Sequence, residues 1–301
     1  MFLLSKPVWM MWLLLAIVLV LNGMAQFFVG FHQLQWIASG LGMALLLVGG
    51  LRLMTSTVRA PGFTPLSALV VVFLTLLTVT TAINYTSPLE VLVGLRTYLP
   101  FWGVFFVMHS GVLDEKTLRK MMYALVVVAA IQWPVEVYQK LFVASERASL
   151  GYFGSAWDSI VGTFGGAKFG GGASGSLAVY VTAIGVIATA WWKAGFMRTS
   201  VFAVVALTCL LAVGLSETKA VFVLLPVGLF VLYRREALKR PGRFMVGVGV
   251  MGALLAVLLF GYYKLFWEEQ HKHGSVWRAL ENRFAYSFDP TFMPAPNWPG
   301  R

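Results

Sequence analysis

The stretch LAVGLSETKAVFVLLPVGLF, Leu211–Phe230, is apolar on both sides of a short polar group, Ser216–Lys219. A bilayer has a hydrocarbon core about 30 Å thick, so a helix that crosses it needs about 20 predominantly apolar residues. The two apolar runs therefore predict two membrane-spanning helices. The polar group between them predicts a turn at the membrane surface, and it raises the question of whether that turn is also a binding site.

The composition of the whole chain indicates a membrane protein. Its 301 residues are 59% hydrophobic and 12% charged, with a mean hydropathy of +0.79, whereas soluble domains are about 25% charged. The net charge of +11 does not indicate nucleic-acid binding, because the basic residues fall mainly in short gaps between apolar runs. The one cysteine, Cys209, excludes an internal disulfide.

Length and apolarity predict an all-α fold, a polytopic transmembrane helical bundle of about nine spans. The first span leads directly into the second, which favours an uncleaved helix over a signal peptide. The predicted spans are residues 8–29, 33–54, 66–84, 89–111, 120–143, 173–192, 200–216, 219–233 and 244–266.

The basic residues predict a cytoplasmic N-terminus. They lie in alternate short connections, whereas the intervening loops at 30–32 and 85–88 carry none, which is the positive-inside pattern. Residues 1–266 are then the transmembrane domain, and 267–301 form an amphipathic, aromatic segment on the outer side. The connections on the inner side carry Lys6, Arg52, Arg59, Lys116, Arg119, Lys120, Lys193, Arg198 and the cluster from Arg234 to Arg243.

In this topology the Ser216–Lys219 turn lies at the outer face. Ser216 can cap the following helix, and Glu217 is favourable near its positive N-terminal end. Lys219 opposes the helix dipole there, so it is better explained if it faces an anion. The structural and functional readings both stay open.

Two further polar groups fall within predicted spans. Arg96 lies about two turns inside its helix, where it either extends to the outer surface or grips an anion such as phosphate. Glu136 and Lys140 are four residues apart, which predicts an ion pair on one helix face. Gln132 and Pro134 add polarity and a kink to the same helix.

The outer loop, residues 144–172, contains the glycine-rich run VGTFGGAKFGGGASGS. Its glycines precede a helix that begins near Ser174 and Ser176, an arrangement that suits an anion or a flexible connector. Lys168 adds a positive charge. The run is not a phosphate-binding P-loop, because the Gly-Lys-Ser/Thr ending is absent.

The C-terminal segment holds His271 and His273, whose spacing does not make a metal site, so we predict no metal. Either histidine is a candidate general base. Arg278 and Arg283 lie on a short amphipathic helix predicted at about residues 275–284, which rests on the outer leaflet if its role is structural.

Four segments together resemble bacterial O-antigen ligase and O-antigen polymerase-like membrane proteins. They are GLRTYLPFWGVFFVMHSGVLDEKTLRKMMYAL, QWPVEVYQ, VGTFGGAKFGGGASGSLAVY and LSETKAVFVLLP, and they occur in the family's order over residues 65–301. The chain ends at NWPGR, which resembles the start of a further family segment. The resemblance therefore implies a shortened sequence that lacks the region of the family's histidine general base.

The resemblance implies a metal-independent, inverting glycosyltransferase without a cofactor, in the bacterial inner membrane. Its partners would be an undecaprenyl-diphosphate-linked glycan, a glycan or lipid acceptor, membrane lipids and other envelope-polysaccharide proteins. The diphosphate would be bound by Arg96, Lys168, Lys219, Arg278 and Arg283, and its departing charge needs such cations. Glu217, His271 and His273, with Glu136, are the outer-side candidates for removing the acceptor's proton.

Two other classes of protein remain open. A transporter or flippase of a lipid-linked or anionic substrate predicts polar groups through the bilayer midplane, whereas here they concentrate in the outer half. A non-catalytic membrane subunit of an envelope assembly complex is the third reading.

Overall fold

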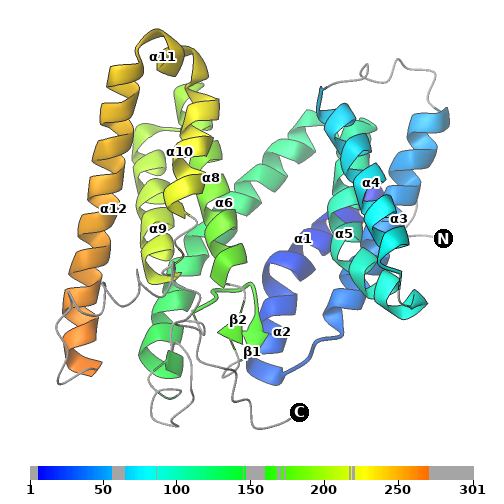
Figure 1. Ribbon diagram of the computed structural model, residues 1–301, viewed down its shortest axis with the longest axis horizontal. Helices are drawn as coiled ribbons and strands as arrows, with labels where there is room; N and C mark the ends of the chain where they lie inside the picture. The colour runs from blue at the N-terminus through cyan, green and yellow to red at the C-terminus, as the bar shows by residue number, and fades with distance from the viewer. Residues whose placement is uncertain are drawn as a thin grey trace. The chain divides into compact units, whose positions relative to one another are not determined.

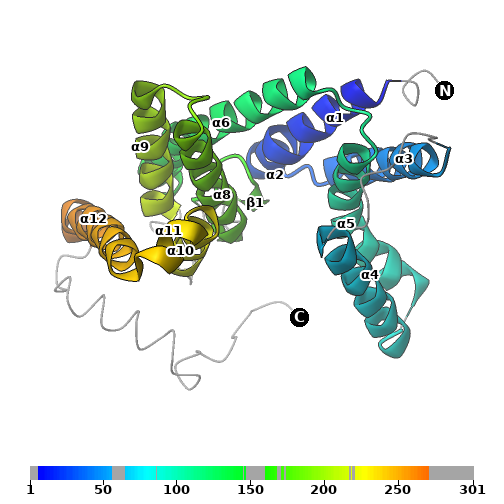
Figure 2. The ribbon, with the colours of Figure 1, turned by 90° about the horizontal axis from the view of Figure 1, so that it is seen from above.

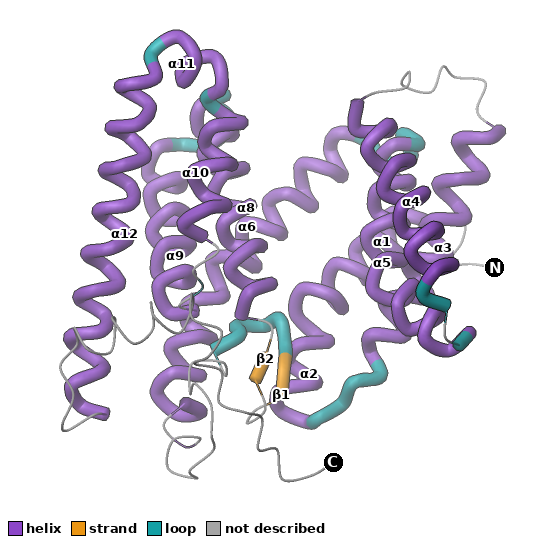
Figure 3. Tube along the Cα trace, viewed as in Figure 1, coloured by secondary structure: helices purple, strands orange, loops and turns teal. Residues whose placement is uncertain are grey.

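The structure is a computed structural model, and it describes residues 6–55, 65–85, 87–144, 146, 160–167, 171–172, 174–216, 218 and 221–270. Figure 3 shows that these residues are almost all helical. The chain divides into two compact units, the first ending at Val221 and the second beginning at Phe222.

The first unit holds most of the helices, which are labelled in Figure 1. They include two π-helical turns, η1 and η2, each continuous with an α-helix. In chain order the elements are α1 (Pro7–Ala16), η1 (Ile17–Leu21), α2 (Asn22–Val29), α3 (Leu34–Thr55), α4 (Pro65–Ile83), α5 (Pro88–His109), α6 (Glu115–Tyr138), η2 (Gln139–Ala144), the two-residue strands β1 (Gly166–Ala167) and β2 (Gly171–Gly172), α8 (Ser174–Lys193) and α9 (Thr199–Ser216).

Six helical stretches of the described chain are long and apolar enough to cross a membrane, which makes this a multi-pass membrane protein. Each of the nine predicted spans falls on a helix. Six of them coincide with these long stretches, and the remaining three coincide with shorter apolar helices. The six long stretches are Pro7–Val29, Leu34–Thr55, Pro88–His109, Glu115–Ala144, Ser174–Lys193 and Thr199–Ser216.

Helix ends follow local sequence signals. Ser87 caps α5 by accepting a hydrogen bond from the backbone N–H of Glu90 (3.3 Å), and Pro88 occupies the first helical position. Asp114 caps α6 in the same way, accepting from the N–H of Thr117 (3.3 Å). Gly30 ends α2 in the left-handed conformation.

Helices α3 and α5 pack side by side through small residues, as Figures 1 and 2 both show. A Cβ added to Gly42 would lie 2.6 Å from the backbone of Leu99, and one added to Gly103 would meet the backbone of Gly42. Further along both helices, a Cβ added to Gly49 would lie 2.7 Å from the backbone of Phe106. The partners advance together, so the two helices run parallel at the close distance that glycine permits.

The apolar core of this unit joins α1, α3, α5 and α6. Met10 and Leu14 of α1 pack with Leu45 of α3, Val107 of α5 and Met121 of α6, and all five are buried. Burial of such side chains, together with close packing, holds helices that lie in lipid.

Helices α6, α8 and α9 pack against one another. At one end, the Tyr123 and Trp191 rings lie 5.2 Å apart and the Arg119 guanidinium lies 5.6 Å from the centre of the Phe196 ring. The basic connection before α6 and the basic connection between α8 and α9 therefore lie at the same end of these helices.

The second unit contains α10 (Val221–Leu232) from Phe222 onward, α11 (Arg234–Lys239) and α12 (Pro241–Gln270). Phe230 and Phe244 pack with ring centroids 5.9 Å apart. α12 has 30 residues, about 45 Å at 1.5 Å per residue. The predicted outer segment beyond Gln270 lies outside the described residues.

Candidate functional site

The segment Ile160–Gly165, hereafter the buried segment, is irregular chain enclosed by helices. All of its residues except Phe164 are buried, and it leads into β1, which lies beside α2 (Figures 1 and 3). Sequence analysis placed this stretch in the outer loop. In the structure it packs against two helical stretches that are long enough to cross a membrane, Pro7–Val29 and Glu115–Ala144. Irregular backbone among such helices is tolerated only if protein supplies its hydrogen bonds or it lines a cavity.

Gln139 supplies three of those hydrogen bonds through one side-chain amide. Its Oε1 accepts from the backbone N–H groups of Val161 (2.9 Å) and Gly162 (2.8 Å). Its Nε2 donates to the carbonyl of Gly162 (2.8 Å). A fully buried glutamine thus replaces the water that these backbone groups would otherwise need.

Gln132 holds the next residue of the segment. Its Oε1 accepts from the backbone N–H of Thr163 (2.8 Å), and its Nε2 donates to the Thr163 hydroxyl oxygen (3.0 Å). The Thr163 hydroxyl in turn donates to the carbonyl of Leu19 in η1. The buried segment is therefore fixed to α6 and to the first span.

Glycine makes the close approach possible on both sides. Gly162 has a φ of +58°, which favours glycine, and a Cβ there would collide with the Gln132 Oε1. On α2, a Cβ on Gly23 would collide with the Thr163 carbonyl oxygen and would lie 2.6 Å from the Phe164 carbonyl carbon.

Both helices that hold the segment carry a π-helical turn at the contact. Leu19, which accepts the threonine hydroxyl, lies in η1, and Gln139 begins η2. π-turns are rare and frequent at functional sites.

Glu136 lies between the two glutamines on the same face of α6. Its side chain is fully buried, and among the described residues neither carboxylate oxygen has a hydrogen-bond partner. The ion pair predicted with Lys140 is not formed, so that prediction was wrong. The α-helical spacing that would align the two side chains is interrupted by η2, which begins at Gln139.

The start of α8 meets the Ser216–Lys219 turn. The Thr218 hydroxyl donates to the carbonyl of Ser174, 3.3 Å away, and Ser216 is buried with its hydroxyl on the Val213 carbonyl. Two stretches that sequence analysis treated as separate anion-site candidates therefore lie together.

Of the predicted site residues, the structure describes Arg96. Its guanidinium lies 4.7 Å from the centre of the Trp36 ring, and its carbonyl accepts from the Ser39 hydroxyl (3.0 Å), so its described contacts are with α3 and not with the buried segment. The other predicted site residues lie outside the described residues: Glu217, His271, His273, Lys168, Lys219, Arg278 and Arg283.

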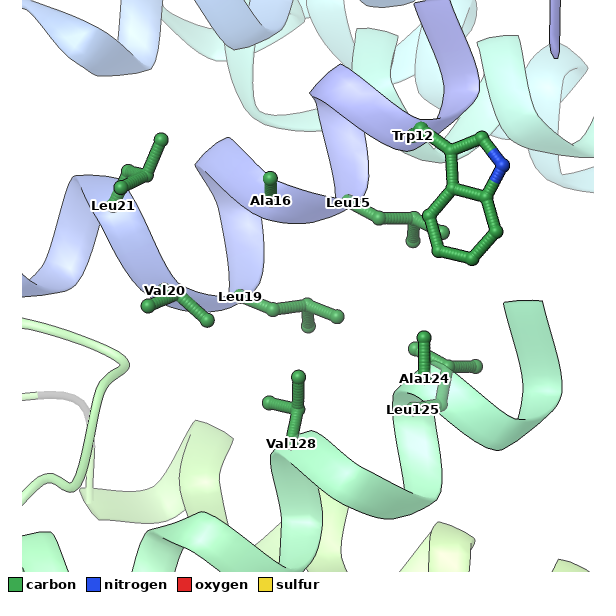
Figure 4. Close-up of a pocket in the computed structure, with 9 residues that line it drawn as sticks. All are labelled: Trp12, Leu15, Ala16, Leu19, Val20, Leu21, Ala124, Leu125 and Val128. Atoms are coloured by element: carbon green, nitrogen blue, oxygen red, sulfur yellow. The ribbon is translucent and has the colours of Figure 1, made fainter. Parts of the chain in front are cut away.

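An apolar cavity of about 320 Å³ lies between the first span and α6. Figure 4 shows side chains of the first span and of α6 facing one another across it. Leu19 both lines this cavity and accepts the Thr163 hydroxyl through its carbonyl. The lining residues are Trp12, Leu15, Ala16, Leu19, Val20, Leu21, Ala124, Leu125 and Val128.

Sequence analysis singled out Gln132 but not Gln139. Positions 132, 136 and 139 repeat with the helical period in an otherwise apolar stretch, which is the signal of a buried polar face. Among the described residues no group of three or more His, Cys, Asp or Glu side chains is arranged to hold a metal ion.

Comparison with protein-family models, with curated proteins and with solved structures finds no match for this chain. The site is therefore defined by its geometry: a glycine-containing segment held by the first span and α6, a buried acid on α6 between the two glutamines that hold it, and an apolar cavity between the same two spans.

Proposed function

We propose that this protein acts in surface-polysaccharide biosynthesis, transferring or polymerising an undecaprenyl-diphosphate-linked glycan at the periplasmic face of the bacterial inner membrane. The observation that carries the proposal is the buried segment, whose polar backbone is held by the first span and α6, the two helices that also line an apolar cavity. A lipid-linked glycan needs both environments, an apolar one for its chain and a polar one for its head.

The contact between Thr218 and Ser174 supports a shared anion site. Lys219 follows Thr218 directly, and Lys168 precedes α8 by six positions in the sequence. In this proposal both lysines, with Arg96, Arg278 and Arg283, bind the diphosphate, and their charge stabilises the departing diphosphate without a metal. Glu217, His271 and His273 are the proposed acceptors of the proton from the acceptor hydroxyl.

We also propose that the chain crosses the membrane nine times with its N-terminus in the cytoplasm. Because α3 and α5 run parallel, the chain must return across the bilayer between them, and α4 is the described helix that can do so. The shared end of the two basic connections, marked by Arg119 and Phe196, supports placing both in the cytoplasm.

The test is binding of a short undecaprenyl-diphosphate glycan to the protein in lipid nanodiscs. Lys168→Ala and Lys219→Ala should each weaken binding about tenfold, because a charge-assisted hydrogen bond contributes about 1.5–3 kcal/mol. Lys239→Ala, in the basic cluster of the predicted inner side, is the matched control. Equal affinity of all four proteins, or no binding, overturns the proposal.

Transfer itself is tested separately, by supplying acceptor glycan and following release of undecaprenyl diphosphate. If the wild type binds the donor but neither transfers nor polymerises the glycan, the enzyme reading fails. A second candidate, transport of the same lipid-linked substrate, is favoured by the position of the buried segment between spans. It predicts movement of the lipid-linked glycan across vesicle membranes.

A further inference from the structure

Glu136 has no role in the contacts that hold the buried segment, yet it lies at their centre. Gln139 holds Val161 and Gly162, and Gln132 holds Thr163, so the segment runs along α6 over position 136. A carboxyl group enclosed in this way, inside a span and without a hydrogen bond among the described residues, is strongly disfavoured as a bare anion.

The surrounding elements offer few charges. Tyr138 follows Glu136 on the same helix, and the nearest charged side chain in sequence is that of Lys140 in η2, with which Glu136 forms no ion pair. The packed helices α8 and α9 carry Tyr180, whose hydroxyl donates to the Leu125 carbonyl, Lys193 in the last turn of α8, and Cys209. The described part of the buried segment contains no ionisable side chain.

The side-chain amides of Gln132 and Gln139 do not stabilise a negative charge on Glu136 either. Both side-chain nitrogens, on Gln132 and Gln139, are committed to the buried segment and to the α6 backbone. The smallest cation that needs no further ligands is the proton.

We propose that Glu136 is a proton-binding site whose occupancy keeps the buried segment closed. When the proton leaves, the O–H bond breaks, the proton passes to water or buffer, and a carboxylate remains. That anion is stabilised only by water or by a cation brought to it, and either requires the Val161–Thr163 backbone to move off α6. This inference goes beyond the proposed function and does not depend on the substrate.

The first test is modification by a membrane-soluble carbodiimide, which adds to protonated carboxyl groups. In the folded wild type at neutral pH we expect Glu136 to be modified, with the exposed Glu90 and Glu115 as internal standards that are not. Modification should fall as the pH is raised. Failure of Glu136 to react while the protein is folded, or reaction no greater than that of Glu115, overturns the proposal.

The second test uses hydrogen exchange of the amides that the glutamines hold, followed by mass spectrometry on the peptide covering 160–167. After correction for intrinsic exchange, the opening equilibrium in the wild type should rise by up to about tenfold per pH unit, the slope of one released proton. Glu136→Gln, which imitates the neutral acid, should remove this slope. If the variant keeps the wild-type slope, the inference is wrong. The carbodiimide test needs no variant and stands if Glu136→Gln fails to fold.

Discussion

The amide oxygen of Gln132 lies 2.8 Å from the backbone nitrogen of Thr163, although the two residues are 31 positions apart in the chain. This hydrogen bond, with those of Gln139, replaces the water that an outer loop would ordinarily use. The buried segment is therefore part of the folded core of the first unit.

Gln139→Ala should destabilise the protein. It leaves the buried N–H groups of Val161 and Gly162 without their acceptor, and each such group costs about 1–3 kcal/mol. The measurement is thermal unfolding in detergent, with hydrogen exchange of residues 160–167. Gln33→Ala, at an exposed position, is the control and should change neither. Equal stability of the two variants would contradict the assigned role of Gln139.

Gly162→Ala, compared with Gly111→Ala, separates the backbone strain of a left-handed residue from the collision of the added Cβ with a neighbouring side chain. A non-glycine residue in the left-handed region costs about 1–2 kcal/mol, and the added Cβ would also displace the Gln132 amide. Gly111→Ala has a similar φ of +66° but open space around it, so it should show the strain alone. Unfolding temperatures of the two variants are compared, and Gly162→Ala should be the lower.

Gly103→Leu should separate α3 from α5. The side chain would occupy the space of the Gly42 backbone, so the two helices cannot keep their present distance. Gly40→Leu places the same side chain on α3 where nothing lies within 4 Å, and it should be tolerated. The readout is thermal stability in detergent together with the yield of folded protein.

The cap of α6 should respond to pH. The hydrogen bond from the Thr117 side chain lowers the pKa of Asp114 below its ordinary value of 3.8. The folded state therefore binds this proton less well, so the contribution is fully present above pH 3.8 and is lost as the pH falls through the lower folded-state value.

Asp114→Asn keeps a capping oxygen but cannot titrate, so it should flatten this part of the stability curve. Asp114→Ala removes the cap and should destabilise at every pH. Unfolding is followed as a function of pH in detergent. A wild-type curve that coincides with that of Asp114→Asn at low pH and at neutral pH would refute the assignment.

The proposed topology predicts which positions react with a membrane-impermeant thiol reagent in intact spheroplasts. On a Cys209→Ala background, cysteine at His32 or Ser87 should be labelled from outside. Cysteine at Lys116 should be labelled only after the membrane is opened. The reverse pattern would place the N-terminus outside.

The helices and the membrane class could be predicted from the sequence because both depend on local apolar length. Arg96 could be recognised as a polar group within a span, but its stacking on Trp36 depends on the packing of α3 and α5. The prediction of a Glu136–Lys140 ion pair was wrong because it assumed regular α-helical spacing, which η2 interrupts at Gln139. The buried segment could not be predicted, because its partners are defined by tertiary contacts.

The hydroxyl of Thr163 is bonded to the carbonyl of Leu19, 144 residues earlier in the chain. During synthesis the first span therefore enters the membrane long before its partner exists. The segment around Thr163 cannot enter the bilayer alone, because its backbone would lack hydrogen bonds there. It can take its place only after the first span and α6 have come together, so this contact forms after both of those spans are in the membrane.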